Sequence, residues 1–240
     1  MSEEREILDQ VRSALRSEPR VRPTAGPLRL GFGDGDLTIE GEVDHVAGKK
    51  RALEAAARVP GVETITDRLR VRPATPMGDG EIRDLVREGL LEDLTLRRCG
   101  VRVRVKGAIE VARAPADPSG RIEVVVEDGI VTLDGEVSGL GLKRLAGVIA
   151  WWVPGARDVI NGIGVVPPEA DSEAAVTDAV HEVLEKDCFV DDDSIVVSTR
   201  QGVVYLDGTV PRGAGRKLAE DDAWYVFGID RVVNRLDVRV

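Results

Sequence analysis

Three stretches of the chain repeat one pattern of apolar and polar positions. The stretches are DGDLTIEGEV (34–43), DGIVTLDGEV (128–137) and QGVVYLDGTV (201–210). In each stretch, apolar and polar residues alternate with a period of two, which predicts a half-buried β-strand. Another apolar strand precedes the stretch, as at 122–126 and 195–198, and only a few residues join the two. We therefore expect a hairpin in each copy.

The glycines of the three copies have identical spacing, which is the mark of an internal repeat. Each copy has two glycines six residues apart and a third glycine 20 residues later. They are Gly35, Gly41 and Gly61, then Gly129, Gly135 and Gly155, then Gly202, Gly208 and Gly228. The first glycine is expected in the hairpin turn, and the third is expected to end a helix in the left-handed conformation. The second is expected where φ is positive or where backbone approaches closely.

Between the second and third glycines the apolar period becomes helical. Ala146, Ala150 and Val153 lie four and three residues apart and share one helix face. The other two copies have Ala52, Ala56 and Val59, and Ala219, Ala223 and Val226. A further amphipathic stretch precedes each hairpin, at 4–16, 81–91 and 172–185. A last alternating run closes each copy at Val71, Val165 or Val238.

These elements predict an α+β fold of three tandem α-β-β-α-β modules. Each module is expected to have a small three-stranded mixed sheet with two helices on one face, and the helical crossover should make its last two strands parallel. The predicted modules are 1–75, 76–168 and 169–240. The second carries an insertion at about 101–120, in which Val101, Val103 and Val105 alternate with basic residues and are expected to extend the sheet. Because such small modules bury little, we expect them to pack on one another.

The repeat resembles the BON domain of bacterial osmotic-stress, secretin-associated and lipid-interacting proteins. The resemblance rests on the G-x-V-x-L-x-G-x-V core, the Ala-x3-Ala-x2-Val helix and the Val-x-Asn-x-Leu-x-Val tail, which in the third copy includes Asn234 and Leu236. All three copies match. The resemblance implies non-enzymatic modules, with phospholipid binding as the function most often attached to them and the periplasm as a frequent location.

Composition and charge narrow the classes of partner. The net charge of −10 makes non-specific attraction to nucleic acid or to an anionic bilayer unfavourable. No apolar run approaches the roughly 20 residues that a membrane-spanning helix needs. The start of the chain, Met1–Arg5, does not have the pattern of a secretory signal, so a cytoplasmic location is expected.

The sequence contains no constellation that predicts catalysis. His45 and His181 accompany no nucleophile, and the motifs of hydrolases and nucleotide-binding enzymes are missing. Cys99 and Cys188 predict neither a disulfide nor a zinc site. The run 191–193 consists of three aspartates without the glycine and glutamate of a calcium loop, so it is interpreted as a solvated charge run. We predict no enzyme activity, no metal and no cofactor.

Two sets of residues are candidates for binding. One pair of cations occupies the same two positions of the second helix in every copy: Lys49 and Lys50, Lys143 and Arg144, Arg216 and Lys217. They could hold phosphate or headgroup oxygens, or form a solvated or internally paired helix face. The aromatic pairs are Trp151 and Trp152, and Trp224 and Tyr225. Trp152 is expected to project outward, either into the packing between modules two and three or into a membrane or protein partner.

The function predicted from the sequence is a non-catalytic BON-repeat binding or scaffolding protein, linked to osmotic or envelope stress. The alternative is a peripheral phospholipid-binding protein that uses the helix cations and the exposed aromatic residues. The expected partner is a protein or a phospholipid surface, and the sequence leaves the oligomeric state open.

Overall fold

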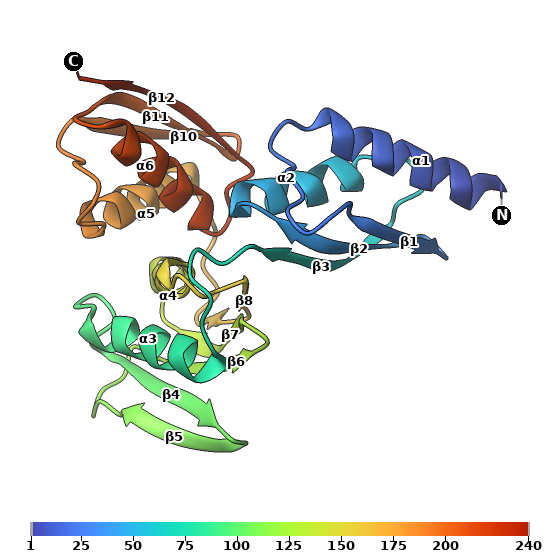
Figure 1. Cartoon of the computed structure of the whole chain (residues 1–240). Coiled ribbons are helices and arrows are strands. Elements are labelled where there is room, and N and C mark those ends of the chain that lie inside the picture. Colours follow the sequence, from blue (N-terminus) through green and yellow to red (C-terminus); the bar gives the residue numbers. More distant parts are fainter. Residues whose placement is uncertain (1, 240) are drawn as a thin grey trace. The chain divides into compact units, whose positions relative to one another are not determined.

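The computed structural model describes residues 2–239, which form two compact units, 1–72 and 73–240. The first unit is a single module, and the second contains two modules (Figure 1). The first module consists of α1 (Ser2–Ser17), β1 (Arg29–Gly33), β2 (Asp36–Val43), α2 (Val46–Ala57) and β3 (Thr64–Val71). Its sheet has the order β1-β2-β3, and both helices cover one face of it (Figure 1).

The second unit repeats this arrangement twice. Its first module consists of α3 (Asp79–Glu92), β4 (Cys99–Val105), β5 (Ala108–Arg113), β6 (Gly120–Glu127), β7 (Ile130–Val137), α4 (Leu140–Trp152), β8 (Asp158–Asn161) and β9 (Gly164–Val165). Its second module consists of α5 (Glu173–Lys186), β10 (Ile195–Arg200), β11 (Val203–Val210), α6 (Gly213–Tyr225) and β12 (Arg231–Val238). The predicted α+β fold of three αββαβ modules is therefore confirmed.

Strand register shows that the three copies align without a gap. In each module the last strand runs parallel to the strand before it, pairing Asp36 with Thr64, Ile130 with Asp158, and Val203 with Arg231. The sequence separation of the two partners is the same in all three modules. The pairing ends at Val43 with Val71, at Val137 with Val165 and at Val210 with Val238. In the second module this last strand is interrupted between β8 and β9.

Each hairpin is closed by a two-residue turn in which both residues have positive φ. The turns are Asp34-Gly35, Asp128-Gly129 and Gln201-Gly202, with φ of 51° and 79°, 54° and 75°, and 49° and 73°. Positive φ at both positions is the requirement of a type I′ turn, whose twist matches that of the strands. Lys106-Gly107 makes the same kind of turn between β4 and β5, with φ of 50° and 85°.

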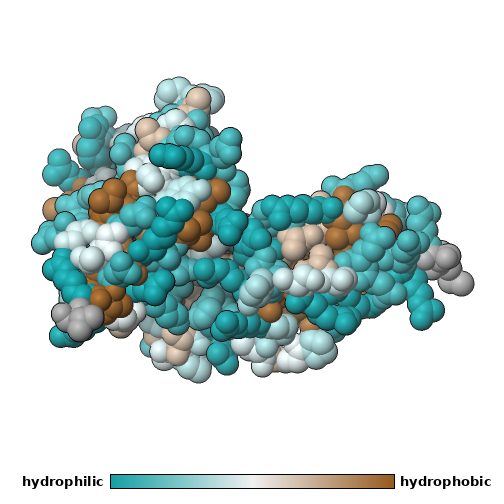
Figure 2. Space-filling view, turned by 90° about the horizontal axis from the view of Figure 1, so that it is seen from above, coloured by the Kyte–Doolittle hydropathy of each residue, from teal (hydrophilic) through white to brown (hydrophobic). Residues whose placement is uncertain are grey.

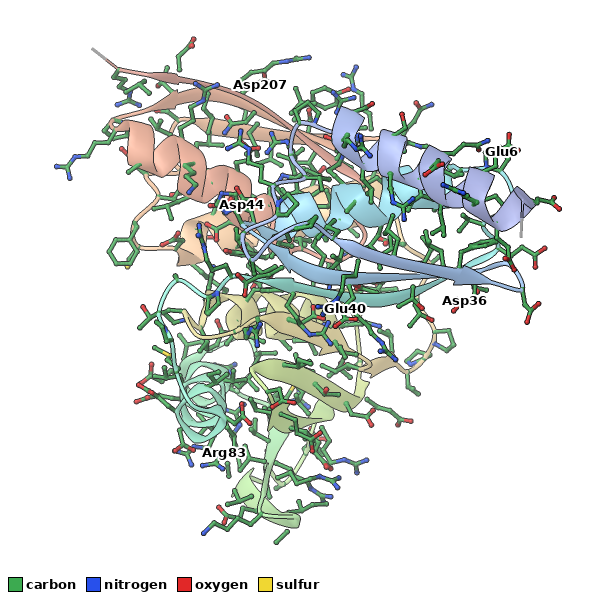
Figure 3. The ribbon with its side chains drawn as sticks, turned by 45° about the vertical axis from the view of Figure 1, so that its right-hand side comes forward. Glu6, Asp36, Glu40, Asp44, Arg83 and Asp207 are labelled. Atoms are coloured by element: carbon green, nitrogen blue, oxygen red, sulfur yellow. The ribbon has the colours of Figure 1, made fainter. Side chains whose placement is uncertain are left out.

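The core of each module lies between the sheet and its two helices. The second strand contributes fully buried apolar residues, such as Val131 and Leu133 in the second module. The helix that follows contributes alanines, here Ala146 and Ala150, which are also fully buried. Because alanine has a small side chain, this helix can approach the sheet closely, and the core needs few aromatic residues. Figure 3 shows Asp36 and Glu40 along β2, on the face of the first sheet away from the helices.

The second and the third glycine of the repeated set in each module have different structural roles. Gly41, Gly135 and Gly208 have φ of 148°, 116° and 124°. A Cβ at Gly135 would lie 2.1 Å from Arg121 O, so both positive φ and close backbone approach apply there. The third glycine does not always adopt the left-handed conformation that we expected. Gly61 and Gly228 have φ of 91° and 89°, but Gly155 lies outside that region, and close approach to Met77 Cβ at 2.6 Å excludes a side chain there instead.

The insertion of the second module enlarges its sheet to six strands. As expected, β4 extends the sheet by pairing parallel to β6, and β5 then adds antiparallel to β4. Arg113, at the end of β5, donates to the carbonyls of Leu90, Leu91, Leu96 and Cys99 at 2.6 to 3.1 Å. These carbonyls include the unpaired C-terminal end of α3, where a cation is favourable. The insertion thus caps the helix that precedes it.

Candidate functional site

The first position of each cation pair contributes to a link between the second helix and the last strand. In the first module, Lys49 is buried, and its Nζ lies 2.9 Å from Asp67 and donates to Leu69 O at 3.0 Å. Asn161 and Asn234 occupy the position of Asp67 in the other modules. Their side-chain amides donate to Lys143 O and Arg216 O at 2.7 and 2.8 Å. The Asn of the repeat tail therefore signals this link, which sequence reasoning missed.

The cation pair of the second module contacts the third module. The guanidinium of Arg144, whose residue is only 1% exposed, donates from Nε to Phe227 O at 3.0 Å and from Nη2 to Asp171 at 2.5 Å. Lys143 Nζ lies 5.0 Å from the centre of the Phe227 ring, a cation–π contact. Both cations thus hold the segment that joins α6 to β12.

The aromatic pairs meet in the same contact. The rings of Trp151 and Tyr225 stack with centroids 5.8 Å apart and an interplanar angle of 10°. Trp152 packs against the core of its own module and donates from Nε1 to Asp222 of the third module at 2.8 Å. Trp224 lies in the core of the third module, 1% exposed. The structure therefore places Trp151, Trp152 and Tyr225 between modules two and three.

Asp222 is an acidic group inside this contact. Burial raises its pKa to about 8, against the opposing effect of the Trp152 hydrogen bond, and the charges of Asp187 and Asp221 raise it further. Burial and the same three carboxyl groups also raise the pKa of Tyr225. The second carboxyl oxygen of Asp222 is buried without a hydrogen bond among residues 2–239. The raised pKa favours the protonated, neutral form of this carboxyl group.

A second group of contacts joins the two modules away from the tryptophans. Lys186 Nζ lies 2.9 Å from Asp93, and Thr95 donates to Glu182 at 3.0 Å. The helices α4, α5 and α6 pack together between the two groups. Modules two and three are therefore joined by apolar packing, charged hydrogen bonds and aromatic stacking.

The remaining predicted cations are not gathered at this contact. Arg216 and Lys217 are exposed on α6, and Lys50 is half-buried on α2 in the first unit. The structure thus brings Lys143 and Arg144 together with the aromatic pairs, but it does not combine the three cation pairs in one site.

A pocket of about 490 Å³ lies on the second module, at a place that sequence reasoning did not single out. The inserted loop contributes Pro115 and Pro118 to its lining, and the guanidinium-bearing residues are Arg102, Arg113 and Arg121. Gly100 and Gly120 also line it. Glu136 adds a carboxylate to the lining, and the guanidinium of Arg113 is engaged by the carbonyls at the end of α3. Within the described residues, no group of three or more His, Cys, Asp or Glu could hold a metal ion.

None of the described helices is both long and apolar enough to span a bilayer. No curated protein sequence matches the chain. One similar solved structure is the C-terminal domain of CdsD, the structural protein of the type III secretion system of Chlamydia trachomatis. It is 14% identical, covers 98% of each chain and has a TM-score of 0.26. A second structure of CdsD is 14% identical, with a TM-score of 0.25, and covers 98% of this chain and 92% of that one. Scores this low carry no argument.

The comparison with family models gives a specific result. The model described as the BON domain matches residues 3–73, 100–167 and 172–240. Each match covers one set of the repeated glycines, and the gap between the first two matches contains α3 and the start of β4. Since the three matches cover most of the sequence and each contains the hairpin, the second helix and the last strand of one module, the chain belongs to the BON domain family, as three tandem copies.

Proposed function

We propose that this chain is a non-catalytic binding or scaffolding protein that presents three BON modules to a protein partner. The observation that carries the proposal is the contact between modules two and three. Binding to a membrane surface would have to use the side chains of Arg144, Trp152 and Tyr225. Each of these side chains instead contacts the neighbouring module. Two modules held in a fixed relation form a platform, and the first module is a separate unit.

The phospholipid alternative receives less support from these contacts. A peripheral lipid binder would insert Trp152 and Tyr225 and direct the helix cations to the headgroups. Here Trp152 donates its N–H to Asp222, and Arg144 is buried against Phe227 O. Arg216 and Lys217 stay exposed, but the net charge of −10 opposes attraction to an anionic surface.

Family membership and the chemistry of the chain support the remaining parts of the proposal. We propose a role in osmotic or envelope stress because BON modules are found in proteins of that kind. The scaffold role itself requires a protein partner.

Affinity capture and vesicle co-sedimentation on the same full-length protein test the proposal. We expect immobilised protein to retain a partner at near-stoichiometric amount in 150 mM salt, and expect phosphatidylglycerol vesicles not to sediment the protein. The lipid function would be favoured instead if the immobilised chain captures no partner protein and the chain binds vesicles. This vesicle binding should then be lost in Arg216→Glu/Lys217→Glu. Arg212→Glu/Arg231→Glu is the charge-matched control.

A further inference from the structure

Strand β10 is an open edge of the third module, whereas its counterpart in the second module is covered. The sheet order is β10-β11-β12 in the third module, but β6 lies between β4 and β7 in the second. The inserted strand β4 therefore occupies the edge that the third module leaves open among the described residues. The second module shows within the same chain how this edge of a BON module accepts an added strand.

The backbone of β10 is oriented to accept such a strand. Thr209 N donates to Ser194 O, just as Ser138 N donates to Ser119 O in the second module. Because hydrogen-bonded and non-bonded pairs alternate in an antiparallel ladder, Ile195, Val197 and Thr199 direct their N–H and C=O groups away from β11. The N–H of Ile195 donates to Asp192 O at 2.9 Å, so Val197 and Thr199 supply the N–H groups that an added strand would use. The equivalent residues of β6 face β4, which pairs Val101 with Ile122 and Val103 with Val124.

The side chains of β10 are less covered than those of β6. Ile122 and Val124 are 0% exposed beneath the sheet that β4 extends. Val197, at the position of Val124, is only half-buried. Val196 is 65% exposed and pairs with Asp207, which projects from the sheet face away from the helices (Figure 3). Figure 2 shows hydrophobic surface gathered on the lobe that ends at the C-terminus. An added strand would bury apolar surface at this edge.

Charge indicates the chemistry of that strand. In the second module, Arg98 immediately precedes β4 and bonds at 2.5 Å to Asp117, which lies shortly before β6. The corresponding approach to β10 contains the three aspartates at 191–193. The approach to β1, the open edge of the first module, has Thr24, Ala25 and Gly26 in those positions. A basic residue ahead of an incoming strand is therefore favoured at β10 and not at β1.

We infer that β10 binds an extended segment of a partner protein as a fourth strand, parallel to it. The segment has one or two basic residues followed by alternating apolar residues, the chemistry of β4 and the residues before it. Main-chain hydrogen bonds supply affinity in this mode of recognition, and alternate side chains supply specificity. The inference rests on the proposed scaffold function, which it deepens by naming where the partner binds.

A labelled peptide with the sequence of residues 97–105 and serine in place of Cys99 is the probe. Its binding to the full chain is followed by fluorescence anisotropy, and the site is located by hydrogen exchange. We expect slower exchange of the Val197 and Thr199 amides and no change in β1. We expect a smaller change in amide exchange in β6. Because β4 belongs to the same chain, it competes with the peptide for β6 at high effective concentration. Protection elsewhere, or no binding, would overturn the inference.

Two variants make the test specific. Val197→Pro removes an N–H from the open edge and leaves the β10–β11 bonds intact, so peptide binding should be lost. Asp191→Asn/Asp192→Asn/Asp193→Asn should weaken it about tenfold, since opposite charges promote such encounters. This triple variant keeps the test decisive if Val197→Pro fails to fold. The control, Asp178→Asn/Glu185→Asn/Asp237→Asn, removes equal charge from exposed sites. Equal weakening by both triple variants would contradict a role for 191–193.

Capture of the natural partner distinguishes a failure of the β10 site from a failure of the scaffold function. If the β10 variants retain the partner as well as the wild-type chain does, the scaffold function stands and the β10 site is wrong. If the wild-type chain retains no protein but binds the peptide along β10, the edge accepts strands and the scaffold function is wrong.

Discussion

Replacing Asp222 by asparagine should stabilise the second unit at neutral pH. The carboxyl group of Asp222 accepts a hydrogen bond from Trp152, and its other oxygen is buried near the carboxyl group of Asp187. Asparagine keeps an acceptor for Trp152 and places an uncharged NH₂ group beside Asp187. The change thus preserves the shape of the site and removes the need to hold a carboxyl group in its neutral form.

The size of the effect follows from the pKa. Asp222 has a pKa of about 8 in the folded chain, against an ordinary value of 3.8. The folded state therefore binds more protons than the unfolded state between these values, and stability falls as pH rises from about 4 to about 8. Each unit costs about 1.4 kcal/mol. At pH 7 the wild type thus loses on the order of 4 kcal/mol relative to a neutral side chain, and at pH 4 it loses almost nothing.

Urea unfolding followed by tryptophan fluorescence measures this effect selectively, because all three tryptophans lie in the second unit. We expect the free energy of unfolding of Asp222→Asn to exceed that of the wild type by a few kcal/mol at pH 7 to 8. The difference should shrink steadily toward pH 4. Titrating groups that do not interact with Asp222 are common to both proteins and cancel. Asp178→Asn, on the exposed face of α5, is the control and should show no such trend. A pH-independent difference would refute the reasoning.

The remaining predictions concern stability, each measured by the same urea unfolding. Gly135→Val should cost about 3 kcal/mol or more, because its Cβ would meet Arg121 O, whereas Gly141→Ala, with open space around it, should be nearly neutral. Trp152→Phe should cost about 1 to 3 kcal/mol by removing the donor to Asp222, and an unchanged stability would show that this bond contributes nothing. Arg113→Met should cost about 2 to 3 kcal/mol and speed amide exchange at the end of α3, and normal exchange there would contradict the capping role.

The parts of the fold that could be predicted are those encoded locally. Turn residues such as Asp128-Gly129, the period-two strands and the buried alanines of the second helix depend on neighbours within a few positions. They recur three times, so each copy supports the interpretation of the others. The parallel pairing also followed from the sequence, because a helical crossover between two strands permits few other arrangements.

The parts that could not be predicted depend on partners distant in sequence. The outward direction of Trp152 follows from helix geometry, but its acceptor, Asp222, lies 70 residues away. Similarly, Arg113 looks like an ordinary basic residue of the insertion until the fold places it at the end of α3. The cation pairs of the three copies look equivalent in sequence, yet the structure gives the equivalent Lys49 and Lys143 different partners, Asp67 and the Phe227 ring. Equivalence within a repeat therefore predicts backbone position better than side-chain role.

The central claim is that the aromatic side chains of α4 and α6, together with Lys143 and Arg144 of α4, join modules two and three and do not engage a bilayer. Quenching of tryptophan fluorescence by phosphatidylglycerol vesicles with brominated acyl chains tests it most directly, because Trp151, Trp152 and Trp224 are the only tryptophans of the chain. The account predicts the same emission with brominated and with ordinary vesicles at any lipid concentration. Quenching by the brominated vesicles that disappears in Trp152→Phe would place this side chain in the membrane and contradict the account.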